Sequence, residues 1–227
     1  MNEETATPYP LRTEDICDVV CEPTADYGKP IVYQGTTINK AIADYYTCNT
    51  NKDRIAILQW IVERTEFQEL RRFSTNENAV YGLNISQYDD ILLSGEMPNN
   101  LAIAQKLVTN KFDVFLLSNP NSTKSADFIL RKRNCLYYVE GKTSTGGSSL
   151  SHRLEEGAKQ ADRIAINFFK YPKTQELIKF INTSFYSNTN LKELLLFKGS
   201  RLITVSRILF ESTKFEDRFY KLWNKQK

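Results

Sequence analysis

Two acidic residues and a lysine are spaced so that they could hold a metal ion and act on a phosphate group. Asp127 lies in one expected strand, residues 126–132, and Glu140 and Lys142 lie in the next, residues 135–143. If the two strands fold into a tight hairpin, antiparallel pairing puts Asp127 opposite Glu140. Lys142 shares the face of Glu140, because side chains alternate along a strand. The spacing therefore predicts two carboxylates and one ammonium group on one face of a sheet.

Phosphodiester hydrolysis is the chemistry that these residue types could perform together. Directly opposed carboxylates destabilise a sheet unless a cation holds them or water screens them. Mg²⁺ (or Mn²⁺) takes one or two carboxylates and keeps several waters, so it could polarise a phosphate and lower the pKa of a bound water. The ammonium of Lys142 could orient that water or neutralise charge on the phosphorane. The alternative is a solvated hairpin face on which Lys142 simply pairs with Glu140, since such spacings are common by chance.

The elements expected around this hairpin give it a context. From Pro98 onward, hydrophobic periodicity predicts a helix, three strands, a helix and a strand, followed by further elements. This order mixes a meander with a crossover, which predicts an α/β protein with a mixed β-sheet flanked by helices. The expected ranges are helix 98–110, strands 112–118, 126–132 and 135–143, helix 149–163, strand 164–169, helix 174–185, strands 192–199 and 201–209, and helix 214–225.

The first part of the chain has a different pattern. We expect a mainly helical N-terminal region at residues 1–95, of unknown role, and a domain that carries the hairpin at residues 96–227. The boundary falls in the segment from Gly95 to Pro98, where a Gly and a Pro bracket a change of pattern. The elements expected before it are an irregular arm at 1–27, a short strand and turn at 29–38, helices at 37–48 and 52–73, and a polar connection at 74–90.

Composition and charge argue against several classes of function. The formal net charge is only +3, so any basic patch for a nucleic acid must be local. Cys17 and Cys21 have no second Cys or His pair to complete a zinc site. The single histidine, His152, argues against a His-based metal site or triad. The sequence has no signal peptide and no long apolar run, which predicts a protein that has no membrane partner and is cytoplasmic when made.

The segments KSADFIL and LYYVEGKTS, followed by GAKQADRIAINF, resemble the PD-(D/E)xK nuclease superfamily. More narrowly, they resemble the C-terminal toxin domains of contact-dependent growth inhibition CdiA proteins, many of which are tRNA nucleases. The resemblance covers about Gly95 to Lys227. It implies a sheet of restriction-endonuclease-like type. It also implies that Asp127, Glu140 and the backbone carbonyl of Gly141 bind the metal, and that Asp127, Glu140, Lys142 and Gln160 are catalytic.

This sequence departs from the pattern of the family at one position. Many members carry an acidic residue at the start of the first core helix, where this chain has Asn99 and Asn100. Glu96 lies just before them and is a further candidate metal ligand. If Glu96 does not substitute, one ligand is missing and a weak or inactive site follows. Gln160 matches a polar position on the helix behind the active strands.

Basic residues at the expected hairpin tip are candidates for phosphate contacts. Three cations beside a metal site would bind nucleic acid in a salt-dependent way. As an alternative, the tip is an ordinary charged turn. The Ser/Thr/Gly loop that follows the second strand could form a rim that lets a nucleic-acid backbone approach. The candidate nucleic-acid-binding residues are Lys124, Arg131, Lys132, Arg133 and Thr143.

Together these observations predict a Mg²⁺-dependent endonuclease that acts on nucleic acid, with RNA (tRNA in particular) ahead of DNA. The resemblance implies a toxin-like domain, secreted or delivered into target cells, with a cognate immunity protein as partner. The competing hypothesis is a non-catalytic nucleic-acid-binding or structural module of a phage or mobile element that keeps the nuclease fold.

Overall fold

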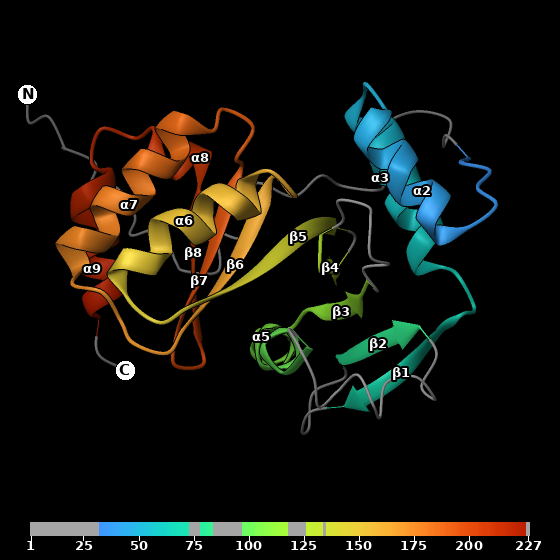
Figure 1. Cartoon of the computed structure of the whole chain (residues 1–227), viewed down its shortest axis with the longest axis horizontal. Helices are drawn as coiled ribbons and strands as arrows, with labels where there is room; N and C mark the ends of the chain where they lie inside the picture. Colours follow the sequence, from blue (N-terminus) through green and yellow to red (C-terminus); the bar gives the residue numbers. More distant parts are fainter. Residues whose placement is uncertain (1–31, 73–77, 84–96, 118–125, 134, 226–227) are drawn as a thin grey trace, which may run out of the picture.

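The protein is an α/β protein built on one mixed eight-stranded sheet (Figure 1). The computed structural model describes residues 32–72, 78–83, 97–117, 126–133 and 135–225. The strands are β1 (Phe67–Arg72), β2 (Ala79–Leu83), β3 (Asp113–Leu116), β4 (Phe128–Lys132), β5 (Cys135–Ser144), β6 (Arg163–Phe168), β7 (Glu193–Lys198) and β8 (Arg201–Ser206). The helices are α2 (Ile38–Thr47), α3 (Asn51–Val62), α5 (Met97–Thr109), α6 (Gly147–Ala158), α7 (Thr174–Ser187), α8 (Arg207–Phe210) and α9 (Phe215–Asn224).

The strands lie in the sheet in the same order as in the chain. Pairing is antiparallel for β1–β2, β3–β4, β4–β5 and β7–β8, and parallel for β2–β3, β5–β6 and β6–β7. The parallel pairs are the ones that a helix connects: α5 runs between β2 and β3, α6 between β5 and β6, and α7 between β6 and β7. The predicted order of helix, three strands, helix and strand is confirmed from α5 to β6.

Helices cover both faces of the sheet, and the alternation of each strand decides which residues meet which helix. On β5, Tyr137 and Val139 belong to the core beneath α5, whereas Leu136 and Tyr138 face the core beneath α2 and α3. On β6, Ala165 belongs to the α5 side, while its neighbours pack against α6, α7 and α9. The sheet therefore has α5 on one face and both the α2–α3 pair and the C-terminal helices on the other.

The N-terminal helices begin where side chains can cap them. The hydroxyl of Thr37 accepts from the backbone N–H of Lys40 at the start of α2, and Thr50 does the same for Asp53 in α3. Helices are thus confirmed at the N-terminal end of the described chain. None of the helices in the part of the chain that the structure describes is long and apolar enough to cross a membrane.

Several expected elements are wrong in detail. The helix expected at 52–73 ends at Val62, and residues 67–72 form β1 instead. The polar connection expected at 74–90 contains β2, in which Val80 is fully buried between its neighbours. Residues 32–37 form no strand. Residues 67–72 and 79–83 form strands because they pair with residues that are distant in the sequence, whereas residues 32–37 take part in no strand pairing. Tertiary pairing thus overrides the local pattern.

Two other boundaries shift by a few residues. Helix α6 ends at Ala158 rather than 163, where the N–H groups of Lys159 and Gln160 bond to the carbonyls three residues back, Glu156 and Gly157. Strand β8 ends at Ser206, whose side chain accepts from the N–H of Leu209 and caps α8. The expected arm at 1–27 lies outside the described residues, and so do residues 84–95 on the N-terminal side of the expected domain boundary.

Candidate active site

The hairpin of β4 and β5 pairs in the register that the sequence predicts. Phe128 lies opposite Val139, and the pairing continues to the tip of the hairpin. One step beyond the first ladder pair, the same register sets Asp127 opposite Glu140. Asp127 directly precedes the first residue of β4. The hairpin therefore brings the two acidic residues to the same end, away from its tip.

Strand β5 changes its partner at this point. It pairs with β4 through residues 135–139 and with β6 through residues 140–144. Because the ladder with β4 has ended, the backbone N–H of Gly141 donates instead to Oδ2 of Asp127, at 2.9 Å. The other oxygen of Asp127, Oδ1, accepts from the side-chain amide of Asn100 in α5, at 3.0 Å. Two hydrogen bonds from two different elements thus hold the Asp127 carboxylate.

Glu140 is a buried carboxylate with an ammonium group beside it. Its side chain is 2% exposed, and Oε1 lies 2.5 Å from Nζ of Lys142. Burial raises the pKa of Glu140 to about 8, with the negative charge of Asp127 as the second cause, while Lys142 acts in the opposite direction. Asp127, Glu140 and Lys142 therefore interact electrostatically, as the spacing along the two strands predicts.

Gln160 contacts Glu140 from the turn after α6. With its amide oriented to satisfy its hydrogen bonds, the amide nitrogen lies 3.0 Å from Oε1 and 3.1 Å from Oε2 of Glu140. The sequence predicts Gln160 on the helix itself, whereas it lies two residues beyond the last residue of α6. The turn aims the side chain back at β5, so Gln160 holds the Glu140 carboxylate in place.

Two tyrosines, Tyr46 and Tyr138, hydrogen-bond to the backbone next to the site residues. The hydroxyl of Tyr138 accepts from the N–H of Ala126 at 2.9 Å, one residue before Asp127. The hydroxyl of Tyr46 in α2 lies 3.3 Å from the Tyr138 hydroxyl and donates to the backbone carbonyl of Gln160 at 2.6 Å. Burial raises the pKa of Tyr138, which therefore stays a neutral hydrogen-bonding group. Tyr46 and Tyr138 thus link the segments that carry Asp127 and Gln160.

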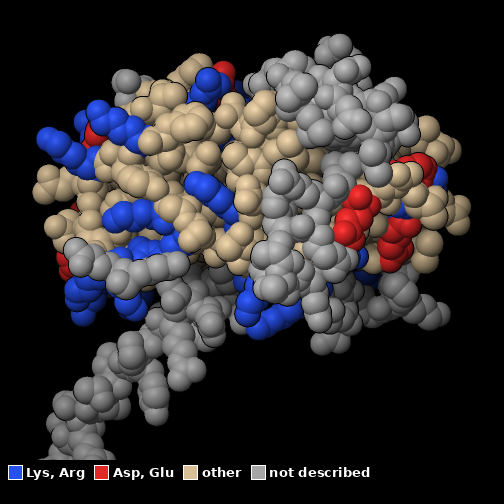
Figure 2. All heavy atoms as spheres, turned by 90° about the horizontal axis from the view of Figure 1, so that it is seen from below, with Lys and Arg blue, Asp and Glu red and all other residues tan. Residues whose placement is uncertain are grey.

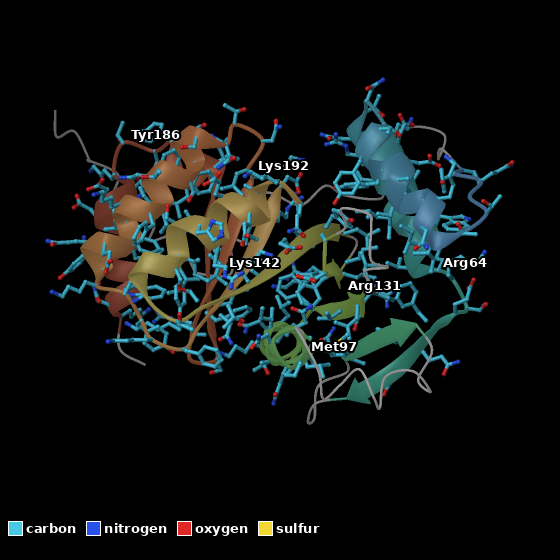
Figure 3. The ribbon with its side chains drawn as sticks, in the orientation of Figure 1. Arg64, Met97, Arg131, Lys142, Tyr186 and Lys192 are labelled. Atoms are coloured by element: carbon cyan, nitrogen blue, oxygen red, sulfur yellow. The ribbon has the colours of Figure 1, made fainter. Side chains whose placement is uncertain are left out.

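A small cleft of about 60 Å³ opens beside Lys142, between the start of α5 and α6. Figure 3 shows Lys142 on β5 in the space between these two helices. The hydroxyl oxygen of Thr143 is buried and has no hydrogen-bond partner among the described residues. Arg153 of α6 reaches the same cleft. The lining residues are Asn99, Asn100, Gly141, Lys142, Thr143 and Arg153.

The cations of the hairpin tip do not lie at this cleft. Arg131 pairs with Asp113 at 3.0 Å, and its guanidinium lies 5.1 Å from the ring centre of Phe115. The ammonium of Lys132 lies over the ring of Phe112. Both belong to the end of β4 opposite to Asp127, so the expectation that the tip lies beside the carboxylates is wrong.

The remaining tip residue, Arg133, has a positive φ of 54° in the turn that joins β4 to β5. It therefore lies at the same far end of the hairpin. The candidates Glu96 and Lys124 are outside the described residues. Of the predicted nucleic-acid contacts that can be placed, Thr143 is the one that lines the cleft.

Sequence reasoning missed the supporting residues. The sequence marks Asn100 only as a position where an acidic residue is absent, yet Asn100 donates a hydrogen bond to Asp127. Tyr138 could have been found from alternation, because it precedes Glu140 by two residues on the same strand face. Arg153 and Tyr46 carry no local signal, since their positions depend on how α6 and α2 pack.

The donors present fit a hard divalent cation. The carboxylates of Asp127 and Glu140 and the carbonyl of Gly141 are oxygen ligands, and Mg²⁺ uses one or two carboxylates with waters in its other positions. Both burial and the neighbouring Asp127 disfavour the charged form of Glu140, so added positive charge would stabilise the pair. Within the described ranges, no group of three or more His, Cys, Asp or Glu residues could hold an ion.

Surface charge is uneven on the face that carries α5. Figure 2 shows Lys and Arg side chains gathered over the half of this face that belongs to the C-terminal elements, whereas Asp and Glu side chains gather toward the opposite end. The small net charge of +3 therefore conceals a local excess of positive charge. Such a surface favours an anionic partner.

The fold and the site define an α/β protein with two carboxylates and a lysine where one strand changes partners. No family model matches the sequence, and no curated protein matches it. Among solved structures, the chain is similar to a CdiA-CT/CdiI toxin and immunity complex from Burkholderia pseudomallei. That match has a TM-score of 0.36 and 15% sequence identity, and covers 50% of this chain and 90% of the other. A similarity of this size carries no argument about function.

Proposed function

We propose that this chain is a metal-dependent nuclease that hydrolyses phosphodiester bonds at Asp127, Glu140 and Lys142. The observation that carries the proposal is the arrangement at the partner change of β5. There the N–H of Gly141 holds Asp127 at 2.9 Å, and the buried Glu140 lies 2.5 Å from the ammonium of Lys142. A solvated hairpin face would leave these charges exposed, whereas Glu140 is 2% and Lys142 12% exposed.

Each residue has a role that follows from its position. The carboxylates of Asp127 and Glu140, with the Gly141 carbonyl, would hold Mg²⁺ or Mn²⁺. The bound cation supplies Lewis-acid polarisation of the phosphate and a water of lowered pKa. The Lys142 ammonium neutralises negative charge that develops on the phosphoryl oxygens. Gln160 keeps the Glu140 carboxylate oriented through its amide.

RNA is the substrate that the resemblance to CdiA toxin domains implies, with tRNA as the first candidate ahead of DNA. The same resemblance implies a toxin-like role and a cognate immunity protein that covers the site. The basic half of the surface in Figure 2 agrees with a nucleic-acid partner without distinguishing RNA from DNA. Thr143, at the cleft, is the proposed contact to the substrate backbone.

Asn100 favours a second candidate function. It occupies a position where many nucleases of this type have an acidic residue, and it donates a hydrogen bond to Asp127 where a further ligand would otherwise bind metal. In that alternative the chain is a non-catalytic nucleic-acid-binding or structural module of a phage or mobile element that keeps the nuclease fold. The nuclease proposal predicts cleavage of nucleic acid, whereas the alternative predicts none.

The test is cleavage by the purified full chain. Pooled tRNA, rRNA and plasmid DNA are each incubated with the protein and Mg²⁺, with EDTA and with the Asp127→Ala variant as controls. The nuclease proposal expects Mg²⁺-dependent loss of at least one substrate that both controls abolish. Survival of all three substrates would overturn it and leave the binding module.

A further inference from the structure

A second and larger cleft lies on the sheet face that is opposite to α5. Its volume is about 470 Å³, which is within the range of sites that hold small molecules or nucleotides. It is formed by α2 and α3, by the turn after α6, and by the loop between α7 and β7. Figure 3 shows Lys192, one of its lining residues, between the C-terminal helices and the α2–α3 pair.

One wall of this cleft is an aromatic ring held in a fixed orientation. Tyr46 is 38% exposed, and its hydroxyl donates to the Gln160 carbonyl at 2.6 Å. The ring meets Tyr45 edge to face, with centroids 5.9 Å apart, and it meets Tyr138 at the same separation. A partly exposed ring that is already oriented loses little entropy when a nucleobase stacks on it.

The other walls are positively charged. The guanidinium of Arg54 lies 5.7 Å from the ring centre of Tyr45, and its Nε is buried without a hydrogen-bond partner in the described part of the chain. Lys159 is paired with an exposed Glu155 on its own helix face, and Lys192 is paired with Asp162. Among the residues that line the cleft, four are basic, Arg54, Lys159, Lys192 and Arg207, and one is acidic, Asp162, so the lining favours an anion.

Gln160 lines the larger cleft and also contacts the carboxylate cluster. Its side-chain amide contacts Glu140, while its backbone carbonyl accepts from Tyr46. An aromatic ring beside phosphate-binding cations is the combination that binds single-stranded nucleic acid. We propose that this cleft binds a nucleotide of the substrate outside the scissile position, with its base on Tyr46 and its phosphate on Arg54 and Lys159. This inference rests on the proposed nuclease function.

The experiment measures binding without cleavage. A fluorescein-labelled single-stranded RNA 12-mer is titrated with the full chain in EDTA and low salt, and anisotropy gives the Kd. Tyr46→Leu removes the ring, whereas Tyr46→Phe keeps the ring and removes only the hydroxyl. We expect Tyr46→Leu and Arg54→Gln to weaken binding by about fivefold to a hundredfold, and Tyr46→Phe to bind nearly as the wild type does.

Two controls keep the test interpretable. Tyr186→Leu changes a tyrosine that is 77% exposed on α7 and does not line this cleft, so it should leave the Kd unchanged. Circular dichroism and thermal melting show that each variant is folded. If Tyr46→Leu binds the RNA as tightly as Tyr186→Leu does, the cleft is not a nucleotide site. If free AMP competes at the same concentration as the oligonucleotide, the occupant is not part of a chain and the proposal is overturned.

The inference and the nuclease proposal fail in different ways. Glu140→Gln should abolish cleavage, and Tyr46→Leu should weaken RNA binding in EDTA by the same factor in the Glu140→Gln background as in the wild type, because Glu140 does not line the larger cleft. RNA binding that depends on Tyr46 without any cleavage by the wild type would reject the nuclease and keep the nucleotide site. Cleavage by the wild type together with unaltered binding by Tyr46→Leu would reject the nucleotide site and keep the nuclease.

Discussion

The carboxylate of Asp127 accepts a hydrogen bond from the backbone N–H of Gly141, 2.9 Å away on the neighbouring strand. Within a regular ladder that N–H would bond to a backbone carbonyl, but β4 begins at Phe128 and offers none. The side-chain carboxylate of Asp127 thus accepts the hydrogen bond that a backbone carbonyl of β4 would otherwise accept. The orientation of Asp127 relative to Glu140 is therefore fixed by main-chain geometry rather than by a flexible side-chain contact.

Gly141→Ala should destabilise the protein, because a Cβ at this position would lie 2.6 Å from Cε2 of Phe128 and 3.2 Å from Oδ2 of Asp127. Overpacking of this kind costs about 1–3 kcal/mol. Urea denaturation measures the loss in the free energy of unfolding, and cleavage should fall with it. The matched control is Gly146→Ala, whose Cβ would have nothing within 4 Å. Equal stability of the two variants would contradict the prediction.

Lys142→Ala should separate catalysis from metal binding. The variant loses the charge that neutralises the phosphoryl oxygens, so cleavage should fall by about two to three orders of magnitude. Mg²⁺ affinity should be kept or raised, because a positive charge near the cation is removed. Calorimetric titration of Mg²⁺ beside single-turnover cleavage measures both.

The same two measurements distinguish the other site residues. Asp127→Ala and Glu140→Ala should lose both Mg²⁺ binding and cleavage, while Gln160→Ala should cost less cleavage than Lys142→Ala. Wild-type cleavage by Lys142→Ala would mean that the charge cluster has no catalytic role.

Tyr138→Phe should weaken the support of Asp127. The change leaves the N–H of Ala126 without its acceptor in a buried environment, which costs about 1–3 kcal/mol of stability. Because Ala126 precedes Asp127, cleavage should fall more than Mg²⁺ affinity does. Tyr186→Phe, at an exposed position on α7, is the control and should change neither quantity. A Tyr138→Phe protein with the stability of that control would refute the supporting role.

Stability should fall as pH rises from about 5 to 9 in the absence of metal. Burial raises the pKa of Glu140 to about 8 and of Glu193 to about 7, from 4.5, so the folded state holds these protons more tightly than the unfolded state. The stabilisation is complete below pH 4.5 and is lost as pH passes 7 and then 8. One such group gives a slope of at most about 1.4 kcal/mol per pH unit.

Glu140→Gln provides the check on this assignment. The variant cannot take up the proton, so its thermal melting temperature in EDTA should depend less on pH than that of the wild type between about pH 5 and 8. The dependence due to Glu193 stays in both proteins. If the two curves run parallel over this range, Glu140 does not titrate with a raised pKa.

Local signals account for the part of the structure that the sequence predicts. The register of the β4–β5 hairpin depends on a short turn and on alternation, so the placement of Asp127 opposite Glu140 could be inferred from adjacent residues. The helix α5 and the parallel strand β6 also carry clear periodicity. These elements are enough to identify the paired carboxylates and Lys142.

Long-range pairing accounts for what the sequence does not predict. Phe67–Arg72 follows a helical pattern and becomes a strand only because Ala79–Leu83 pairs with it and with β3. The contact from Asn100 to Asp127 depends on how α5 crosses the sheet, and the contact from Gln160 to Glu140 depends on where α6 ends. Neither can be read from neighbouring residues.

The parallel pairing of β2 with β3 has a consequence for any shortened form of this protein. Val80 and Tyr81 cover the outer side of Val114 and Phe115. A chain that began at α5 would leave the backbone N–H and C=O groups of β3 unpaired along a hydrophobic strand, which is a template for aggregation between molecules. Such a chain would need a charged residue or a proline among Val114, Phe115 and Leu116, in addition to Asp113, to resist this association.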